Sequence, residues 1–135
     1  MPANHLIYLA APYSHPRLRV RRARVKATAH FCALMQHNRL HVHAPIVHNH
    51  TIWEEYPKRN LAPSTDDYIQ WSLDMLERSN SLWVLMLPGY STSSGIKLEV
   101  GHARRLGLPV NWIIPSKVRD WSDPFYDAYC DVDEL

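Results

Sequence analysis

Short apolar runs alternate with longer helical segments along this chain, and this alternation is the strongest constraint on its fold. The runs are HLIYLA at 5–10, LHVHA at 40–44, SLWVLMLP at 81–88 and PVNWIIP at 109–115. Between the runs lie segments of ten or more residues, most of which repeat apolar residues every three or four positions, as one face of an α-helix does. Strands separated by such helices predict an α/β fold with a mostly parallel sheet. We expect one three-layer sandwich over residues 1–135, with a flavodoxin-like or Rossmann-like sheet of about five strands.

Three helices are predicted from apolar spacing and from the residues at their ends. The first begins near Ser14 and Pro16, a capping serine followed by a proline suited to a first helical turn. Its apolar face carries Val20, Ala23, Ala27, Phe31 and Leu34.

The second helix follows Ser64, a favoured capping residue. Its apolar face carries Ile69, Leu73 and Leu76. The third starts after Gly95 and ends at Gly107, two residues before a proline. Its apolar positions are Ile96, Val100, Ala103 and Leu106.

Residues 45–65 separate the second apolar run from the second helix. They are rich in proline, histidine and aromatic residues. We expect an irregular loop here, and loops of this length in compact domains are often functional.

The composition narrows the class of protein. The chain has 135 residues, of which 46% are hydrophobic and 21% charged, as in one globular domain. Its formal net charge of +2 is too small to indicate a nucleic-acid-binding protein. Cys32 and Cys130 lack metal-ligand spacing, and no secretory signal or membrane-spanning apolar segment is present. We therefore expect a cytoplasmic protein with free thiols and without membrane contacts.

The fold class indicates where a ligand should bind. Open parallel sheets bind ligands beyond the carboxyl ends of the strands, near the point at which strand order reverses. Three segments should meet there: AAPYSHP at 10–16, the histidine-rich segment after the second run, and PGYSTSSG at 88–95. With only four glycines, the chain contains neither a dinucleotide fingerprint nor a Walker loop. The Ser/Thr-rich turn still offers hydroxyls and free N–H groups at a helix start, which suit a phosphate or carboxylate. Alternatively, Ser93 or Ser94 serves only as the helix cap.

Glu99 stands at an unexpected position on the third helix. In angle it lies between Ile96 and Val100, inside the apolar stripe and about one turn from the helix start. Since an unpaired buried carboxylate is costly, Glu99 requires a partner or a chemical role. Either it bonds a neighbouring arginine or backbone group, or it acts at the mouth of the site as a nucleophile or base.

The segments IYLAAPY, PGYSTSSGIKLEVGHA and GLPV resemble, in their order and spacing, the nucleoside 2-deoxyribosyltransferase-like superfamily. That family includes nucleoside 5'-monophosphate N-glycosidases and small proteins of unassigned function, and the resemblance covers the chain to about residue 115. It implies that Glu99 attacks the anomeric carbon of a ribosyl or deoxyribosyl group, which releases the base and leaves a glycosyl-enzyme ester. It also implies that Tyr8 helps to hold this nucleophile; without the resemblance, Tyr8 would be interpreted as a core aromatic residue.

The residue six positions before the glutamate implies the type of substrate. Members of the family that take free nucleosides carry aspartate there, whereas those that take 5'-monophosphates carry serine, and this chain has Ser93. A hydroxyl can bind a phosphate that a carboxylate would repel. Further binding residues are expected from the two turns: Pro12, Ser91, Ser94 and Gly95. Arg17 or Arg19 is expected to reach the phosphate, although most of the basic run RLRVRRARVK is typical of a solvated helix face.

The residue expected to assist the leaving base differs between this chain and the family. The family's aspartate on the second helix aligns with Ser72, and Asp74 lies two residues later, on a different face of the helix. Asp74 is the first candidate for this role. Asp66 or Asp67 at the helix start, or an impaired chemistry, are the alternatives.

The histidines of HNRLHVHAPIVHNH have two interpretations. His41 and His43 share one face of a strand, which suits zinc, but no nearby ligand completes a set. An exposed sheet edge explains them equally well, and we expect no metal. His48 and His50 fall in the segment over the site, where with Trp53 they would stack on or bond a nucleobase.

These observations favour hydrolysis of the N-glycosidic bond of a (deoxy)nucleoside 5'-monophosphate through Glu99, without a cofactor. Transfer of the sugar to a second base is the alternative, and it differs only in how well the pocket excludes water. Another class of function, a non-catalytic nucleotide-binding or sensing module, is favoured by the missing aspartate at Ser72. Nucleic-acid binding by the arginine-rich helix is disfavoured, because aromatic residues are not interleaved with the basic ones. The resemblance also implies a homodimer or a larger homo-oligomer.

Overall fold

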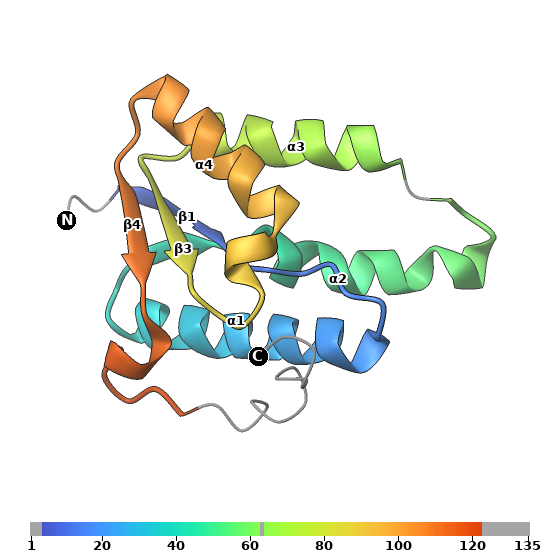
Figure 1. Cartoon of the computed structure of the whole chain (residues 1–135), viewed down its shortest axis with the longest axis horizontal. Coiled ribbons are helices and arrows are strands. Elements are labelled where there is room, and N and C mark those ends of the chain that lie inside the picture. Colours follow the sequence, from blue (N-terminus) through green and yellow to red (C-terminus); the bar gives the residue numbers. More distant parts are fainter. Residues whose placement is uncertain (1–3, 63, 123–135) are drawn as a thin grey trace.

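Four parallel strands form one sheet at the centre of the computed structural model, which describes residues 4–62 and 64–122 (Figure 1). The strand order is β2 (His41–His43), β1 (Leu6–Ala10), β3 (Ser81–Leu85) and β4 (Val110–Ile113). The predicted α/β fold with a parallel sheet is confirmed, with four strands in the described residues rather than about five. From β1 the chain goes to one side of the sheet to form β2 and then crosses to the other side for β3 and β4. The strand order therefore reverses between β1 and β3.

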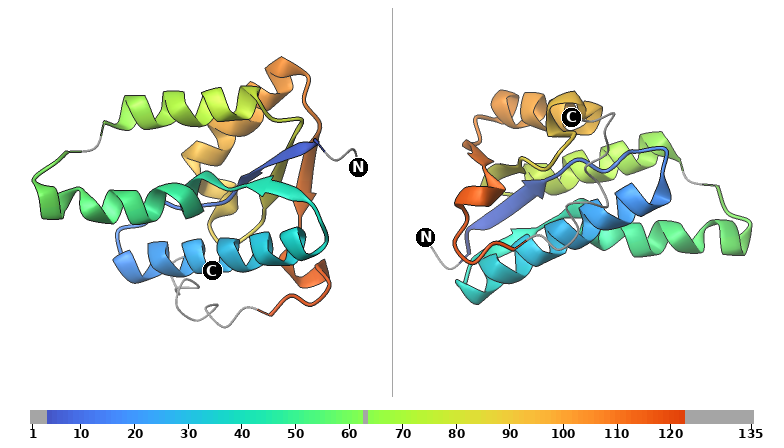
Figure 2. Two further views of the ribbon diagram at one scale, coloured as in Figure 1. Left: turned by 180° about the vertical axis from the view of Figure 1, so that it is seen from behind. Right: turned by 60° about the horizontal axis from the view of Figure 1, so that its bottom comes forward.

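Helices cover both faces of the sheet and complete the three layers (Figures 1 and 2). Helix α1 (Leu18–His37) lies on one face, and helices α3 (Thr65–Glu77) and α4 (Ser94–Leu106) lie on the other. Because successive strand residues point to opposite faces, β1 sends Leu9 into the core under α1 and Tyr8 into the core under α3 and α4. Both core clusters are made of buried aliphatic and aromatic side chains.

The helix starts and ends follow the capping residues with one exception. Ser64 Oγ accepts a hydrogen bond from the N–H of Asp67 at the start of α3, and α4 ends at Gly107 with φ 74°, both as predicted. Helix α1 instead begins at Leu18 after Arg17, whose side chain makes no capping bond. Its expected starting residues, Ser14 among them, lie in the preceding segment, which is free to line the site.

Four expected core positions of the apolar faces are not fully buried: Leu34 on α1, Ile69 and Leu73 on α3, and Leu106 on α4. Leu106, in the last turn of α4, is 44% exposed. Leu34 of α1 is only partly buried. The remaining stripes of α1 and α4 are buried as predicted: Val20, Ala23, Ala27 and Phe31 on α1, and Ile96, Val100 and Ala103 on α4.

The prediction of an irregular loop over 45–65 is wrong, since helix α2 (Pro45–Glu55) occupies most of it. Pro45 ends strand β2 but also stands in the first turn of α2, where proline needs no N–H partner and its fixed φ suits a helix. A 3-10 turn (Pro57–Arg59) follows, and then a left-handed Asn60 with φ 55°. Helices α2 and α3 (Thr65–Glu77) form an arm that extends beyond the carboxyl edge of the sheet (Figures 1 and 2).

The expectations about cysteines and membranes are tested in part. Cys32 is a free thiol, and burial raises its pKa to about 11. Cys130 lies outside the described residues. Among the helices that the structure describes, none is long and apolar enough to span a bilayer.

Candidate active site

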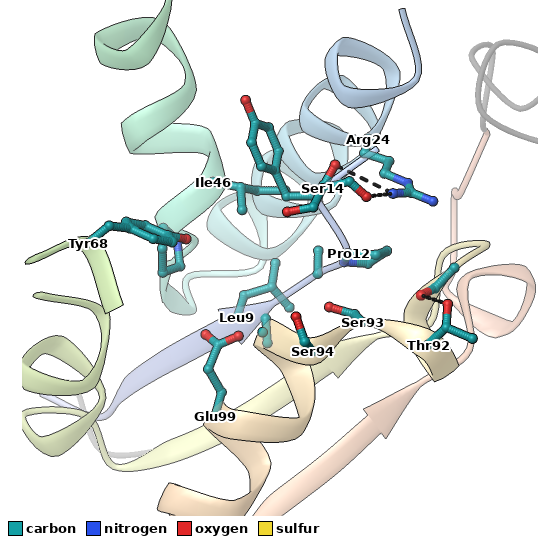
Figure 3. Close-up of a pocket in the computed structure, with 16 residues that line it drawn as sticks. Leu9, Pro12, Ser14, Arg24, Ile46, Tyr68, Thr92, Ser93, Ser94 and Glu99 are labelled. Carbon is teal, nitrogen blue, oxygen red and sulfur yellow. Dashed lines mark hydrogen bonds between the residues drawn. The ribbon is translucent and has the colours of Figure 1, made fainter. Parts of the chain in front are cut away.

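A cavity of about 220 Å³ opens at the carboxyl ends of β1 and β3, where the strand order reverses. The segments that follow β1, β2 and β3 meet around it, as predicted. Its walls are built by residues 9–14, Arg24, residues 45–46, Tyr68, Gly89, residues 92–95 and Glu99. Figure 3 shows Glu99 and Tyr68 at one side, Arg24 and Thr92 at the other, and Ser93 and Ser94 between them. The cavity therefore has a carboxylate and a cation at different ends.

Glu99 lies on α4 between the buried residues Ile96 and Val100, and its carboxylate points into the cavity (Figure 3). Burial disfavours the charged form and raises the pKa of Glu99 to about 7, while the neighbouring Tyr8 hydroxyl partly opposes this by stabilising the anion. The apolar stripe of α4 thus places one carboxylate at the cavity wall, in surroundings that raise its pKa into the neutral range. A group of this kind is a candidate nucleophile or base at neutral pH.

Tyr8 is fully buried beneath the cavity, at the centre of the sheet. Burial first, and then the negative charge of Glu99, raise the pKa of its hydroxyl, so that it stays protonated. Across residues 4–62 and 64–122, neither the Tyr8 hydroxyl nor Ser72 Oγ makes a hydrogen bond of normal geometry, although both are buried. The Tyr8 hydroxyl nevertheless interacts with the Glu99 carboxylate and with Ser72, so these three groups form a buried polar cluster beneath the cavity.

The start of α4 provides the groups that could hold an anion. Ser93 Oγ accepts a hydrogen bond of 3.2 Å from the N–H of Ile96, so Ser93 is the helix cap. A cap of this kind leaves its own hydroxyl hydrogen available, and the first N–H groups of a helix have no partner within the helix. A Cβ atom added to Gly95 would lie 3.8 Å from Ser93 Oγ and 3.9 Å from Glu99 Oε1. The capping turn and the carboxylate are therefore direct neighbours.

Arg24 closes the other end of the cavity and is only 3% exposed. Its Nη1 donates to the carbonyl of Ser14 at 2.9 Å, and its Nη2 donates to the carbonyl of Pro88 at 3.2 Å. One guanidinium thus ties the segment after β1 to the segment after β3. It also adds a fixed positive charge to the cavity wall, which favours an anionic ligand.

A chain of polar side chains holds Tyr13, another residue of the cavity wall. Glu54 accepts hydrogen bonds from Arg22 Nε at 3.0 Å and from His50 Nε2 at 2.7 Å, and the bond from Arg22 lowers the pKa of Glu54. The Tyr13 hydroxyl and His50 Nδ1 lie 2.7 Å apart in a second hydrogen bond, in which Tyr13 is the donor when the imidazole is neutral with its hydrogen on Nε2. His50 is therefore enclosed behind the cavity wall rather than exposed within it.

The other expected base-binding residues also lie behind or beside the wall. The ring of Trp53 packs against Tyr13 at 5.2 Å and against Tyr68 at 4.6 Å, so it supports two residues that line the cavity. His48 is exposed and stacks on Trp71 at 5.6 Å. Neither His48 nor Trp53 contributes to the wall of the cavity.

The structure separates the remaining predicted residues into two groups. Pro12, Ser93, Ser94, Gly95 and Glu99 line the cavity. Ser91, Arg17, Arg19 and Asp74 do not. Arg17, directly before α1, and Arg19, in its first turn, are exposed. Asp74 accepts a hydrogen bond from Gln70 on its own helix. Asp66 and Asp67 are exposed in the first turn of α3.

Sequence reasoning did not identify Arg24, Ser14, Tyr13 or Tyr68 as residues of the site. For Arg24 a signal existed, since position 24 falls within the stripe of Val20 and Ala27 and so faces the core. Ser14 and Tyr13 follow β1 directly, at the edge where a ligand was expected. Tyr68 lies one helical turn before Ser72 and had no signal of its own.

No group of three or more histidines, cysteines or carboxylates in the described part of the chain is arranged to hold a metal ion. His41 and His43 belong to β2, the edge strand of the sheet; His41 is exposed, as the interpretation of an exposed edge predicts, whereas His43 is partly buried. The His43 ring packs against Tyr8 and Trp71, and burial lowers its pKa.

The chain matches a known protein family over most of its length. A family model described as a domain of unknown function, DUF1937, matches residues 5–114. This range contains all four strands and every residue of the cavity wall. No curated protein matches the chain at a significant level.

Proposed function

The chain belongs to the DUF1937 family, and we propose that it hydrolyses the N-glycosidic bond of a nucleoside or deoxynucleoside 5'-monophosphate through a glycosyl ester of Glu99. One observation carries this proposal. A partly buried carboxylate with a raised pKa shares a single cavity with a capped helix start and a buried arginine. A sugar phosphate is the ligand that uses both ends of such a cavity.

The size of the cavity supports a compact substrate. Its volume of about 220 Å³ lies below the roughly 300–1,000 Å³ of pockets for larger ligands. A ribosyl 5'-phosphate would place its anomeric carbon at Glu99 and its phosphate toward Ser93, Ser94 and Arg24. The base would then extend toward Tyr68 and the arm.

The proposed reaction has two displacements. In the first, ionised Glu99 forms a bond to the anomeric carbon while the bond to the base breaks, and the base leaves with the electron pair. In the second, water attacks the same carbon, the ester breaks and Glu99 is restored as a carboxylate. The proton lost by the water balances the proton gained by the base. Tyr8, protonated and adjacent, stabilises the carboxylate at the start and end of the cycle.

A second candidate, a module that binds a nucleotide without cleaving it, is favoured by one specific observation. Helix α3 presents Ser72 rather than a carboxylate beneath the cavity, and Asp74 is bonded to Gln70 instead. A third outcome, transfer of the sugar to a second base, shares the first displacement with hydrolysis and differs in the acceptor.

The test is to incubate the protein with ribo- and deoxyribonucleoside 5'-monophosphates and the matching nucleosides, and to measure released base by chromatography. Glu99→Gln should abolish release, whereas the matched control Glu77→Gln should not, because Glu77 is 47% exposed on α3 and pairs with His102. Adding a second free base distinguishes transfer from hydrolysis by its product. Nucleotide binding without release of base would contradict the enzyme proposal and support the binding module.

We also propose that the protein acts in the cytoplasm as a homodimer or larger homo-oligomer. The free thiol of Cys32 supports a reducing compartment, and the family resemblance supports the oligomer. Light scattering coupled to size-exclusion chromatography would give the mass of the particle, and a monomer at assay concentrations would contradict this part of the proposal.

A further inference from the structure

Helix α3 lacks a carboxylic acid at the cavity, although the proposed reaction needs a group to stabilise the departing base. Ser72 occupies the expected position, and its hydroxyl is buried. The Asp74 carboxylate is bonded along the helix to Gln70 at 2.8 Å. Asp66 and Asp67 are exposed at the far end of the helix. None of these carboxylates contributes to the cavity wall.

Tyr68 is the residue that α3 does present to the cavity. Among the described side chains of this helix it alone lines the cavity, and it stands one turn before Ser72 on the same helix face. Figure 3 shows its hydroxyl pointing toward the cavity on the side where Glu99 lies. Burial first, and then the charge of Glu99, raise the pKa of Tyr68, and the second effect agrees with the two groups being close.

The ring of Tyr68 is held in this position from behind. Trp53 of α2 packs against it edge-on, with ring centroids 4.6 Å apart and an interplanar angle of 84°. Trp53 also contacts Tyr13, whose hydroxyl is fixed by His50. The two helices of the arm therefore fix one phenol at the cavity, and such fixed donors are what catalysis of bond cleavage requires.

We propose that Tyr68 donates the hydrogen bond that stabilises the leaving base, in the place where a carboxylic acid of α3 would otherwise act. The inference rests on the proposed function. As the bond between the anomeric carbon and the base nitrogen breaks, the electron pair moves onto the base, and the Tyr68 O–H binds an acceptor atom beside that nitrogen. Purine N3 and pyrimidine O2 are acceptors of this kind. The base then takes its proton from water.

Because the side chain of Tyr68 is a phenol, it assists the leaving base by hydrogen bonding rather than by full proton transfer. Burial raises the pKa of Tyr68 to about 12, so it remains a hydrogen-bond donor throughout the neutral range and does not transfer its proton fully. It therefore helps a leaving group that accumulates negative charge. A leaving group that departs readily as an anion gains little from it.

The test compares Tyr68→Phe with wild type on two substrates that differ in the leaving group. One is the nucleoside 5'-monophosphate that wild type cleaves best, and the other is 4-nitrophenyl β-D-ribofuranoside 5-phosphate, whose nitrophenolate leaves without a proton. Tyr68→Phe removes one fixed hydrogen-bond donor, so it should lower kcat on the nucleotide by about 100-fold and leave kcat on the nitrophenyl compound nearly unchanged. Tyr56→Phe, at the end of α2 and outside the cavity wall, is the matched control.

The outcomes distinguish the two proposals. Wild type that releases neither base nor nitrophenolate from any phosphate overturns the proposed function, and this inference with it. If wild type is active, three results overturn the inference alone: an equal loss on both substrates, no loss on the nucleotide, or failure of wild type to cleave the nitrophenyl compound. Thermal unfolding of Tyr68→Phe, which keeps the ring that packs on Trp53, checks that the fold is retained.

Discussion

Replacing Glu99 by glutamine should stabilise the protein, and the gain should grow with pH. The carboxyl group has an ordinary pKa of 4.5 in the unfolded chain and about 7 in the folded protein, because burial disfavours its charge. As the pH rises from 4.5 to 7, the unfolded chain releases a proton that the folded protein still holds. The folded state therefore loses stability across this window, and the loss is complete above pH 7.

The size of the effect follows from the two pKa values. Each pH unit between them corresponds to about 1.4 kcal/mol, so the interval from 4.5 to about 7 gives at most about 3.5 kcal/mol at pH 8. At pH 5 the same calculation gives less than about 1 kcal/mol. Glutamine keeps the shape of the side chain and carries no charge, so Glu99→Gln should recover this free energy of unfolding. For a chain of this length the gain at pH 8 is about 10 °C in Tm.

Urea unfolding of wild type and Glu99→Gln at pH 5 and pH 8 measures the effect directly. Other groups titrate equally in both proteins and cancel in the comparison. Glu77→Gln, at an exposed site on α3, should show a small difference at both pH values. The reasoning is refuted if Glu99→Gln gains the same stability at pH 5 as at pH 8, or if it is less stable than wild type at pH 8.

The proposed hydrolysis should accelerate as the pH is raised through about 7, because only ionised Glu99 can attack; a flat profile of kcat/KM from pH 6 to 8 would contradict this. Gly89→Ala should cost more stability than Gly107→Ala in urea unfolding. Both glycines have positive φ, but an added Cβ would lie 2.3 Å from Arg24 Nη2 only at Gly89, so about 1 kcal/mol is expected at Gly107 and clearly more at Gly89. Ser93→Asp should keep the helix cap but raise KM for monophosphates by at least about tenfold relative to nucleosides, through repulsion between like charges; equal changes for both substrate types would argue against a phosphate at this position.

The parts of the site that could be predicted are those with local signals. Ser93, Gly107 and the stripe around Glu99 belong to one helix, and capping, termination and apolar periodicity all act within a few residues of the chain. The same is true of Ser64 at the start of α3. These signals depend little on the rest of the fold, and they placed α4 and its carboxylate correctly.

Helix α2 could not be predicted in the same way, because what holds it is distant in sequence. Its buried polar residues include His50, which is fixed by Tyr13, and its Glu54 pairs with Arg22 of α1. Pro45 was consistent both with the end of a strand and with the first turn of a helix. Histidines and aromatic residues give weak helical preference, so tertiary contacts decided the structure of this segment.

Arg24 shows how a charged residue can be hidden by its neighbours in the sequence. It stands in a basic run whose other members are mostly exposed, and the run as a whole resembles a solvated face. Its partners are the carbonyls of Ser14 and of Pro88, which is 64 residues away. Position 24 falls within the buried stripe of α1, but only the folded chain brings these carbonyls together around one guanidinium, so the partners of Arg24 could not be predicted from the run.

The two charges of the cavity are satisfied to different degrees, and this difference fits the chemistry proposed for them. Arg24 directs its guanidinium to backbone carbonyls and thereby fixes two loops, whereas the Glu99 carboxylate has mainly the Tyr8 hydroxyl to oppose the effect of burial. If Arg24 instead paired with Glu99, the pKa of Glu99 would fall and its reactivity as a nucleophile would decrease. Keeping the cation at the other end leaves Glu99 reactive and retains a positive charge for an anionic group. Burying Glu99 lowers the stability of the folded protein. The hydrogen bonds by which Arg24 ties the two loops together offset part of this loss.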